Sequence, residues 1–307
     1  MIGQGVGNVG VGQVNLHQQQ LNTADQTLTT AQTKVANRGL GDKIVAWLRN
    51  KGVVTSQSPT MQNVRNAITT KVGADSAQAI FDHLKMGPNK SLTGQQITAA
   101  INLANRVQAG QQTPIGQAFL NMPAPNQTTT PAARFAVSLI GVEKAMAASG
   151  VDRGNLTDAE LVSIFDYSAD GFTHVNNQLR TGNPDADVQA YRTTLNGALA
   201  KLPDHQGDVY RCVTLPGNVL SNYTAGAQVT ELGYSSTSKA EGEAGNFRSD
   251  HRMFIHSSHG KDISGFSRSP SEEEVLFPAG AQFNILSRQD EPNYMGGTPK
   301  CRLVMQD

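Results

Sequence analysis

Apolar residues recur at helical spacing through the first part of the chain. Ser58 and Pro59 combine an N-cap residue with proline at the first helical position, and apolar residues follow every three or four positions as far as Val72. The same spacing predicts further helices over residues 42–52, 76–85 and 94–107. Together these segments predict a small helical domain over residues 41–121.

A break in this periodicity follows the predicted helical domain. Prolines and polar residues in MPAPNQTTTP, residues 122–131, predict a linker. Helical spacing resumes over residues 134–148. Thr157 and Glu160 then form a capping box, in which each side chain bonds to the backbone N–H of the other residue, and this predicts the start of another helix.

From about Asp208 the pattern changes to short runs of β-branched and aromatic residues, with turn residues between them. The predicted strands span residues 209–214, 228–232, 252–256, 275–277, 283–286 and 302–305. Helices followed by many short strands are typical of an α+β domain, whereas a parallel α/β sheet alternates strands with helices. We therefore predict an α+β fold.

The first segment, residues 1–38, is rich in Gly, Gln, Asn and Thr, and Asp25 is its only Asp, Glu, Lys or Arg before Lys34. Such a segment buries too little apolar surface to offset the entropy of ordering it, so we predict disorder. Its glycines at positions 5, 7 and 10 match the G-x-G-x-x-G dinucleotide fingerprint. That motif follows a β-strand, and only four residues precede it here, so we discount it.

Composition narrows the range of partners. The 25 basic and 25 acidic residues cancel, so net charge gives no sign of binding to nucleic acid or to an anionic membrane. The sequence contains no apolar run of about 18 residues, the length expected of a membrane-spanning helix. It also lacks the basic start and apolar core of a secretory signal peptide, so export would need a different route.

Three polar features accompany the predicted strands. Arg211 follows apolar residues in a strand, where it is either a solvated edge charge, the commoner case, or a planar fork for an oxyanion. The hydroxyl cluster of residues 235–238 is typical of a turn, and no G-x-S-x-G motif surrounds it. Glu272, Glu273 and Glu274 form either a solvated turn or, in an extended chain, a pair of carboxylates on one face with Glu273 on the other. The two negative charges of such a pair repel each other, which raises the pKa of one carboxyl group. A carboxyl group with a raised pKa suits acid–base chemistry.

Two further groups of residues carry weaker signals. His251, His256 and His259 match none of the strong zinc patterns, so we expect no metal and ordinary surface histidines. Cys212 and Cys301 can form at most one disulfide, and the sequence does not decide whether they meet.

An arginine on one strand, then Ser-Thr-Ser, then Glu-x-Glu is an order that resembles the mono-ADP-ribosyltransferases of the R-S-E class. LTDAELVSIFDYSADGFTHVNNQLRTG resembles the helical entry of that family, with Tyr167, Asn176, Leu179 and Arg180. VYRCVTLPG and GYSSTS resemble its first strand and its Ser-Thr-Ser strand, and DISGFSRSPSEEEVLFPAGAQFNIL resembles its turn-turn loop and neighbouring strands. The resemblance covers residues 125–307 and implies the ADP-ribosyltransferase fold, a helical entry followed by a two-sheet β core.

The resemblance also implies roles at an NAD site. Arg211 would hold the NAD phosphates, and Ser236, with Thr237 beside it, would contact the nicotinamide-ribose end and orient the catalytic glutamate. Glu274 would accept a hydrogen bond from the ribose 2′-hydroxyl and stabilise the oxocarbenium-like transition state. NAD would be a co-substrate, and no metal is implied.

On the acceptor side, the resemblance gives Glu272 the role of positioning or deprotonating the acceptor, usually an arginine when a glutamate stands there. Phe266 would offer an aromatic ring to the target protein. Many relatives have glycine where Cys212 stands, a change that we expect to be tolerated if the thiol faces the core.

The polar N-terminus is similar to that of bacterial effectors injected by type III secretion, one branch of which modifies a threonine of host ubiquitin. These features imply a secreted transferase that acts on a host protein in the host cytoplasm, with a threonine or an arginine as acceptor. A secretion chaperone would bind the N-terminal region. An NAD glycohydrolase, with water as acceptor, and a binding module without activity are the rival interpretations. The complete set of Arg211, Ser236, Glu272 and Glu274 argues against the last of these.

Overall fold

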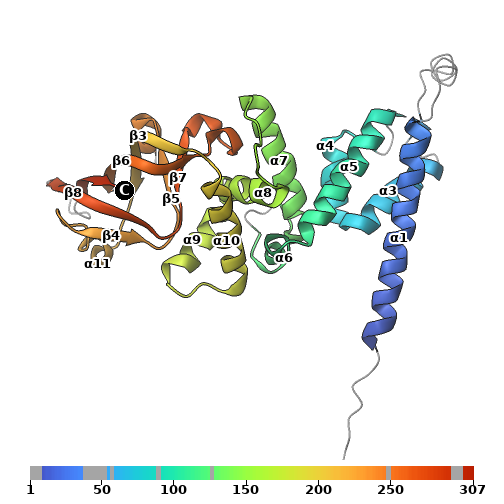
Figure 1. The fold of residues 1–307 in the computed structure, drawn as a ribbon, viewed down its shortest axis with the longest axis horizontal. Coiled ribbons are helices and arrows are strands. Elements are labelled where there is room, and N and C mark those ends of the chain that lie inside the picture. The colour runs from blue at the N-terminus through green and yellow to red at the C-terminus, as the bar shows by residue number, and fades with distance from the viewer. Residues whose placement is uncertain are drawn as a thin grey trace, which may run out of the picture. The chain divides into compact units, whose positions relative to one another are not determined.

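A computed structural model describes residues 9–36, 54–55, 59–87, 91–124, 128–246, 250–291 and 300–307 of the chain (Figure 1). These residues divide between two compact units, one comprising Met1–Gln112 and Ala132–Val137 and the other Thr113–Pro131 and Ser138–Asp307. The short helix α6 (Pro114–Asn121), which precedes the predicted linker, therefore lies in the second unit.

The first unit is helical where the structure describes it. Its helices are α1 (Val9–Ala36), α3 (Pro59–Val72), α4 (Ala74–His83) and α5 (Gly94–Gln111), and the two-residue strands β1 (Val54–Thr55) and β2 (Ser91–Leu92) pair antiparallel. Helices α3, α4 and α5 confirm three of the predicted helices. The fourth, over residues 42–52, lies outside the described residues.

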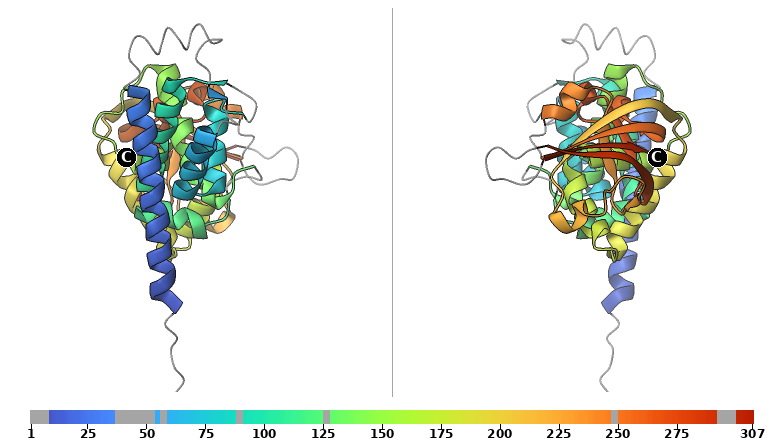
Figure 2. Two further views of the ribbon diagram at one scale, coloured as in Figure 1. Left: turned by 90° about the vertical axis from the view of Figure 1, so that its right-hand side faces the viewer. Right: turned by 90° about the vertical axis from the view of Figure 1, so that its left-hand side faces the viewer.

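Helix α1 occupies most of the segment for which we predicted disorder, so that prediction is wrong for Val9–Ala36. Ala24, Leu28 and Ala31 are buried, and their spacing puts them on one face of the helix, which contacts α3 and α5 (Figure 2). Four threonine hydroxyls donate to carbonyl oxygens one turn back and so satisfy polar groups within the helix. The prediction of disorder used the composition of the whole segment, in which this short apolar stripe is outnumbered by polar residues.

The helices of the second unit form the entry to its sheet. Helix α7 (Arg134–Ser149) belongs to this unit from Ser138 onward. It is followed by α8 (Asp158–Asp166), a π-helical turn (Tyr167–Gly171), α9 (Phe172–Arg180) and α10 (Ala186–Ala200). The capping box of Thr157 and Glu160 is confirmed at the start of α8. Helix α10 packs against α6 and α8.

The sheet of the second unit contains every strand that the pattern predicted. Its strands are β3 (Asp204–Val213), β4 (Gln228–Glu231), β5 (Ser235–Ser238), β6 (His251–Asp262), β7 (Glu274–Phe277), β8 (Ala281–Glu291) and β9 (Lys300–Gln306). Their order is β3-β5-β7-β6-β9-β8-β4, and β3 also pairs with β6. The right-hand view of Figure 2 shows β3, β6, β9 and β8 side by side.

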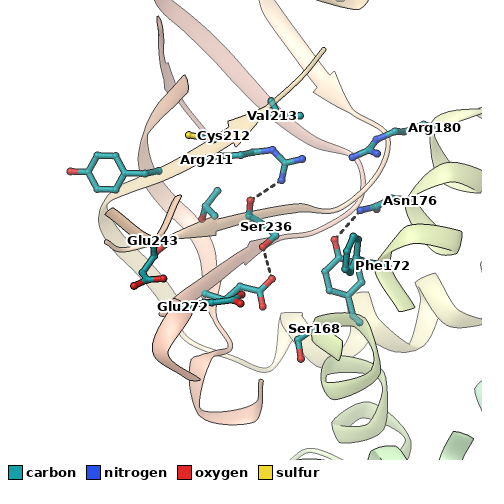
Figure 3. Close-up of a pocket in the computed structure, with 15 residues that line it drawn as sticks. Ser168, Phe172, Asn176, Arg180, Arg211, Cys212, Val213, Ser236, Glu243 and Glu272 are labelled. Atoms are coloured by element: carbon teal, nitrogen blue, oxygen red, sulfur yellow. Dashed lines mark hydrogen bonds between the residues drawn. The ribbon is translucent and has the colours of Figure 1, made fainter. Parts of the chain in front are cut away.

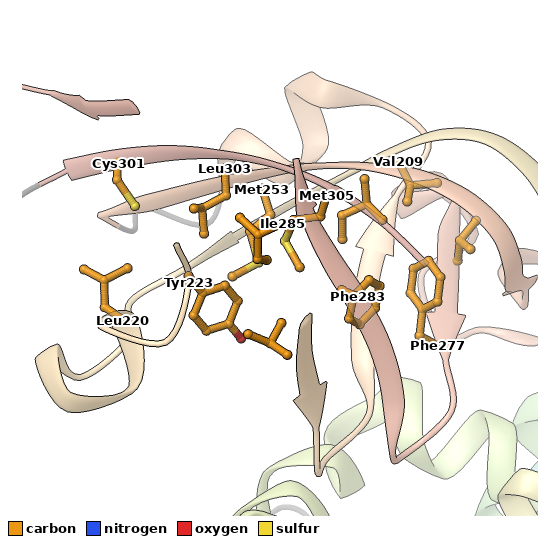
Figure 4. Close-up of a cluster of buried hydrophobic side chains, with 13 residues drawn as sticks. Val209, Leu220, Tyr223, Met253, Phe277, Phe283, Ile285, Cys301, Leu303 and Met305 are labelled. Atoms are coloured by element: carbon orange, nitrogen blue, oxygen red, sulfur yellow. The ribbon is translucent and has the colours of Figure 1, made fainter. Parts of the chain in front are cut away.

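The additional β3–β6 pairing closes a circuit of four strands, from which β9, β8 and β4 continue. The two sheets expected from the resemblance are thus two parts of one hydrogen-bonded sheet. Both parts contribute to one apolar core, whose residues come from β3, β4, β6, β7, β8 and β9, with Leu220 and Tyr223 from the segment between β3 and β4 (Figure 4). Within this core the rings of Phe277 and Phe283 pack edge to face, with their centroids 5.0 Å apart. The α+β prediction is confirmed.

Candidate active site

A pocket of about 280 Å³ in the second unit has a helical wall and a strand wall (Figure 3). The helical wall comes from the π-helical turn and α9, and the strand wall from β3, β5, the start of β7 and the turn before it. The lining residues are Tyr167, Ser168, Phe172, Asn176, Arg180, Tyr210, Arg211, Cys212, Val213, Ser236, Thr237, Ser238, Glu243, Glu272 and Glu274. The pocket therefore collects Arg211, Ser236, Thr237, Glu272 and Glu274 from the residues that the sequence singled out.

Arg211 enters the pocket because of its place in β3. Val209 belongs to the buried core and Val213 packs against it, so Arg211, which lies between them at alternate positions, shares their inward face. Arg211 Nη1 donates to the carbonyl oxygen of Ser236 at 2.7 Å. Sequence reasoning favoured a solvated edge charge, and the half-buried guanidinium shows that this interpretation is wrong.

The hydroxyls of residues 235–238 belong to strand β5 and do not form a turn. Ser236 Oγ donates to Glu274 Oε1 at 2.6 Å, and Thr237 Oγ1 donates to the carbonyl oxygen of Val275 at 2.6 Å. The antiparallel pairing of β5 with β7 brings the two strands into this register. The Ser236 hydroxyl therefore orients the carboxylate of Glu274. The Thr237 hydroxyl attaches β7, the strand that carries Glu274, to β5.

Glu274 is buried, with 5% of its surface exposed. Burial raises its pKa to about 7, and the negative charge of Glu272 acts in the same direction. The hydrogen bond from Ser236 and the positive charge of Arg211 oppose that shift. Near neutral pH the carboxyl group therefore populates both of its protonation states.

The turn before Glu274 corrects the reasoning about the three glutamates. We assumed an extended chain, but Pro270–Glu272 forms a 3₁₀ turn and Glu273 has a left-handed backbone with φ 47° and ψ 47°. Glu272 and Glu274 nevertheless both line the pocket, while Glu273 is exposed. The predicted pairing is confirmed, and a reversal of the chain at Glu273 produces it instead of strand alternation.

The helical wall is built around a buried hydrogen-bond network. Asn176 Nδ2 donates to the Tyr167 hydroxyl at 3.0 Å, and Asn176 Oδ1 accepts from the backbone N–H of Tyr234 at 2.8 Å. Burial raises the pKa of Tyr167, and the nearby charge of Glu274 raises it further. A side chain at Gly233 would place its Cβ 2.8 Å from Asn176 Oδ1, so this close approach needs glycine.

Several lining residues received no role from the sequence, among them Ser168, Phe172 and Glu243. Phe172 is 45% exposed and meets the ring of Tyr167 edge to face at 6.2 Å. The available signal in the sequence was an aromatic residue directly after the turn residues Asp170 and Gly171. Glu243 lies in the short helix α12 (Glu241–Asn246), where nothing in the sequence distinguishes it from a solvated acid.

Arg180 and Arg211 lie on opposite walls with their guanidinium groups directed toward one another (Figure 3). Both also line a second cavity of about 890 Å³, which extends past Tyr223 and Glu231. The two cavities therefore meet at a pair of cations. This arrangement suits an elongated ligand with a negatively charged centre.

Comparisons with known proteins agree with this geometry. A family model described as "ART: NAD:arginine ADP-ribosyltransferase" matches residues 144–295. The solved structure of the ADP-ribosyltransferase HopU1 of Pseudomonas syringae has a TM-score of 0.50 at 19% identity, over 63% of this chain and 94% of that chain. The second unit has the ADP-ribosyltransferase fold. The fold expected from the resemblance is thereby confirmed.

Two curated relatives share the ADP-ribosyltransferase segment. The chain is 35% identical over 138 residues to the NAD(+)–protein-arginine ADP-ribosyltransferase Tre1 of Pseudomonas putida, which is 44% of this chain and 27% of that protein. It is 30% identical over 138 residues to Tre1 of Serratia proteamaculans, which is 44% of this chain and 30% of that protein. The similarity thus spans less than a third of either relative.

Phe266 does not lie where the resemblance to ADP-ribosyltransferases suggested. It is 5% exposed and is absent from the residues that line the pocket, because the turn Ser264–Phe266 packs its ring inward. A buried ring offers no surface to a target protein, so the predicted recognition role is wrong for this conformation.

Cys212 does not meet the condition under which we expected it to replace glycine. Cys212 is half-buried and lies on the opposite face of β3 from Arg211, so its thiol does not join the apolar core, although the residue is among those that line the pocket. Burial raises the pKa of this thiol. Cys212 and Cys301 do not form a disulfide with each other.

The three histidines are dispersed. His251 is fully buried, and its Nδ1 accepts from the backbone N–H of Leu215 at 3.1 Å, so the expectation of a surface residue is wrong there. His256 pairs with Asp208, and His259 pairs with Asp307. Across the part of the chain that the structure describes, no three His, Cys, Asp or Glu side chains group as metal ligands, and no helix is long and apolar enough to cross a membrane.

Proposed function

We propose that the chain is an NAD-dependent protein mono-ADP-ribosyltransferase that modifies arginine side chains. The observation that carries the proposal is the hydrogen bond of 2.6 Å from Ser236 to the buried Glu274, in a pocket that Arg211 also lines. The family description and the names of the two relatives, which specify NAD and arginine, support the same reaction. The proposed catalytic domain spans residues 125–307, after a helical domain over residues 41–121.

In this proposal NAD lies across the two joined cavities. Its diphosphate binds between Arg180 and Arg211, because planar guanidinium groups bind phosphate oxygens in pairs. The nicotinamide-ribose end lies beside Ser236, Thr237 and Glu274. The adenosine end occupies the larger cavity beyond the two arginines.

The reaction breaks the bond between ribose C1′ and the nicotinamide nitrogen. Nicotinamide leaves with the bonding electron pair, and positive charge develops on the ribose. The Glu274 carboxylate, oriented by Ser236, accepts a hydrogen bond from the ribose 2′-hydroxyl and stabilises that charge. A guanidinium nitrogen of the acceptor then bonds to C1′, and its proton passes to Glu272 and on to solvent.

Glu272 is the residue that favours arginine as the acceptor. Its side chain lines the pocket beside Glu274 and pairs in charge and shape with a guanidinium group. A threonine hydroxyl, as on ubiquitin, carries no positive charge to pair with Glu272. We therefore place arginine first and treat threonine of ubiquitin as the alternative acceptor.

We extend the proposal to delivery into a host cell. The segment of residues 1–38, with its polar and weakly charged composition, supports a secretion signal that a chaperone binds. The proposed target is then a host protein in the host cytoplasm. Removing residues 1–38 would abolish delivery while the catalytic domain keeps its activity in solution, which a translocation assay in infected cells would measure.

The proposal is tested by incubating the full chain with labelled NAD and three separate acceptors: agmatine, ubiquitin and host-cell lysate. Mass spectrometry then identifies the modified side chain. Label on agmatine and on arginine residues supports the proposal. Label on a ubiquitin threonine instead shows that threonine, and not arginine, is the acceptor. Nicotinamide release without transfer identifies a glycohydrolase. Absence of both release and transfer rejects an enzymatic function and leaves the binding module.

A further inference from the structure

The loop that carries Glu272 is attached to the helical wall of the pocket by Arg268. The backbone N–H of Arg268 donates to Ser168 Oγ at 3.0 Å. Its Nη1 donates to the carbonyl oxygen of Ala169 at 3.1 Å and to Asp170 Oδ2 at 2.9 Å. All three acceptors belong to the π-helical turn, which contributes to the lining of the pocket. One arginine therefore joins the loop before Glu272 to the opposite wall.

Glu274, on the other side of the turn, is held by separate contacts. The backbone N–H of Ile263 donates to the carbonyl oxygen of Glu274 at 3.0 Å, and that of Lys239 donates to Glu273 at 3.2 Å. Ser236 holds the carboxylate itself. These contacts do not pass through Arg268, so its loss leaves Glu274 in place.

Loss of the Arg268 side chain removes two of its three bonds to the helical wall and leaves the backbone bond to Ser168 Oγ. The bond from Lys239 to the carbonyl oxygen of Glu273 also remains, together with short-range contacts. The backbone N–H of Ser269 donates to Ser267 Oγ at 3.2 Å, and that of Glu272 donates to the carbonyl oxygen of Ser269 at 3.0 Å. Both bonds lie within the loop and turn with it. The attachment through Arg268 therefore fixes the turn of Glu272 relative to the helical wall.

We propose that Arg268 is a positioning residue that fixes Glu272 for transfer to an acceptor side chain and thereby favours transfer over hydrolysis of NAD. The inference rests on the proposed function and adds to it the residue that sets the balance between the two outcomes. Correct placement of a reacting group lowers the barrier only while the group stays in its productive position. Water, which is small and abundant, needs no such placement by Glu272.

The contact is exposed, which makes it suitable for mutation. The side chains of Arg268 and Asp170 are 55% and 42% exposed, and exposed ion pairs contribute little to global stability. The Arg268→Ala variant is therefore expected to fold. Because a single nitrogen, Nη1, makes both side-chain contacts, the lysine ammonium of Arg268→Lys can replace them.

Arg153 provides a matched control in the same unit. Its Nη2 donates to the carbonyl oxygen of Leu156 at 2.8 Å and to Asp158 Oδ1 at 2.9 Å. The chemistry is the same as at Arg268, but Arg153 lies before α8 and is not among the residues that line the pocket. Any general effect of losing a guanidinium bound to a carbonyl and a carboxylate appears in Arg153→Ala as well.

The first test measures, for each variant, transfer to agmatine and nicotinamide release without agmatine. We expect Arg268→Ala to raise the KM for agmatine about fivefold to tenfold, while nicotinamide release and the KM for NAD stay within about twofold of wild type. Arg268→Lys restores the KM, and Arg153→Ala matches wild type. An unchanged KM for agmatine in Arg268→Ala, or a parallel fall in nicotinamide release, overturns the inference while the proposed function stands.

The second test does not depend on activity. Amide hydrogen exchange in Arg268→Ala should accelerate over residues 268–273 and stay unchanged over residues 274–277 of β7. Unchanged exchange over residues 268–273 shows that Arg268 does not hold the turn and overturns the inference. A wild-type protein that neither releases nicotinamide nor modifies agmatine rejects the proposed function and the balance that Arg268 would set.

Discussion

The groove of the first unit is larger than the pocket that contains Glu274 in the second unit, but it offers less chemistry. The groove between α1 and α3 measures about 540 Å³ and is lined by neutral residues, among them Gln19, Thr23, Asn63 and Asn66. The pocket of the second unit measures about 280 Å³ but is lined by two arginines and three glutamates. Amides and hydroxyls in an open groove are satisfied equally well by water, whereas converging charges with a perturbed pKa mark a reactive site. Charge, and not volume, distinguishes the two cavities.

The largest effect that tests this comparison is expected at Glu274. Glu274→Gln keeps the shape of the side chain but removes the charge that stabilises the developing oxocarbenium ion. We expect nicotinamide release to fall about 10²–10³-fold, the loss typical of one electrostatic contact to a transition state. Glu273→Gln, one residue away and exposed, is the control and should keep nearly full activity. Equal losses in the two variants would contradict the assignment of Glu274 to the pocket chemistry.

A smaller effect is expected at the cation between the two cavities. Arg211→Lys keeps the positive charge but loses the planar fork that binds two phosphate oxygens. We expect the KM for NAD to rise about tenfold to a hundredfold, the range for one hydrogen bond to a charged group. Initial-rate kinetics over a range of NAD concentrations measures this, with Arg153→Lys as the control. A change in kcat alone would instead assign Arg211 to the chemical step.

The pH profile should reflect the burial of Glu274. The carboxylate is the active form and the pKa is about 7, so activity should rise with pH and level off above that value. Below it, the rate should fall about tenfold for each pH unit. Glu272→Gln removes a negative charge that raises this pKa, so the midpoint of nicotinamide release should move to lower pH. A midpoint that does not move would show that the two carboxylates are uncoupled.

The smallest effect is expected in the groove of the first unit. Asn66→Ala removes a neutral amide from the groove lining, and both NAD hydrolysis and transfer to agmatine should stay within about twofold of wild type, as for surface substitutions. Thr70→Val provides a second variant of the same lining. A marked loss of activity in either variant would contradict the conclusion that the charged pocket is the reactive site and that the neutral groove is not.

The sequence predicted the site better than it predicted the path of the chain through it. The order of arginine, Ser-Thr-Ser and Glu-x-Glu identified the residues that meet in the pocket, because the strands that carry them are neighbours in the sheet. The turn at Glu273 was not predicted, since its left-handed backbone is set by contacts of the loop and not by the preference of glutamate. The π-helical turn has no reliable sequence signal.

The errors elsewhere have the same origin. Phe266 was assigned to the surface by resemblance, but the packing of its loop buries the ring. Helix α1 was taken for disorder on composition, although Ala24, Leu28 and Ala31 form a stripe that α3 and α5 can cover. In both cases tertiary contacts outweighed the local signal.

Burial of Glu274 also affects folding. The pKa is raised from 4.5 to about 7, so the folded state binds this proton more tightly than the unfolded chain does. The resulting stabilisation is complete below pH 4.5 and is lost as the pH rises through 7, a change of about 3 kcal/mol at most. As the pH rises through this range, Glu274 ionises. The proposed reaction gains its catalytic carboxylate, and the folded state loses the stabilisation that the protonated carboxyl group provides. The cationic nicotinamide ring of bound NAD would offset the loss, because the substrate adds its positive charge to that of Arg211 beside the Glu274 carboxylate.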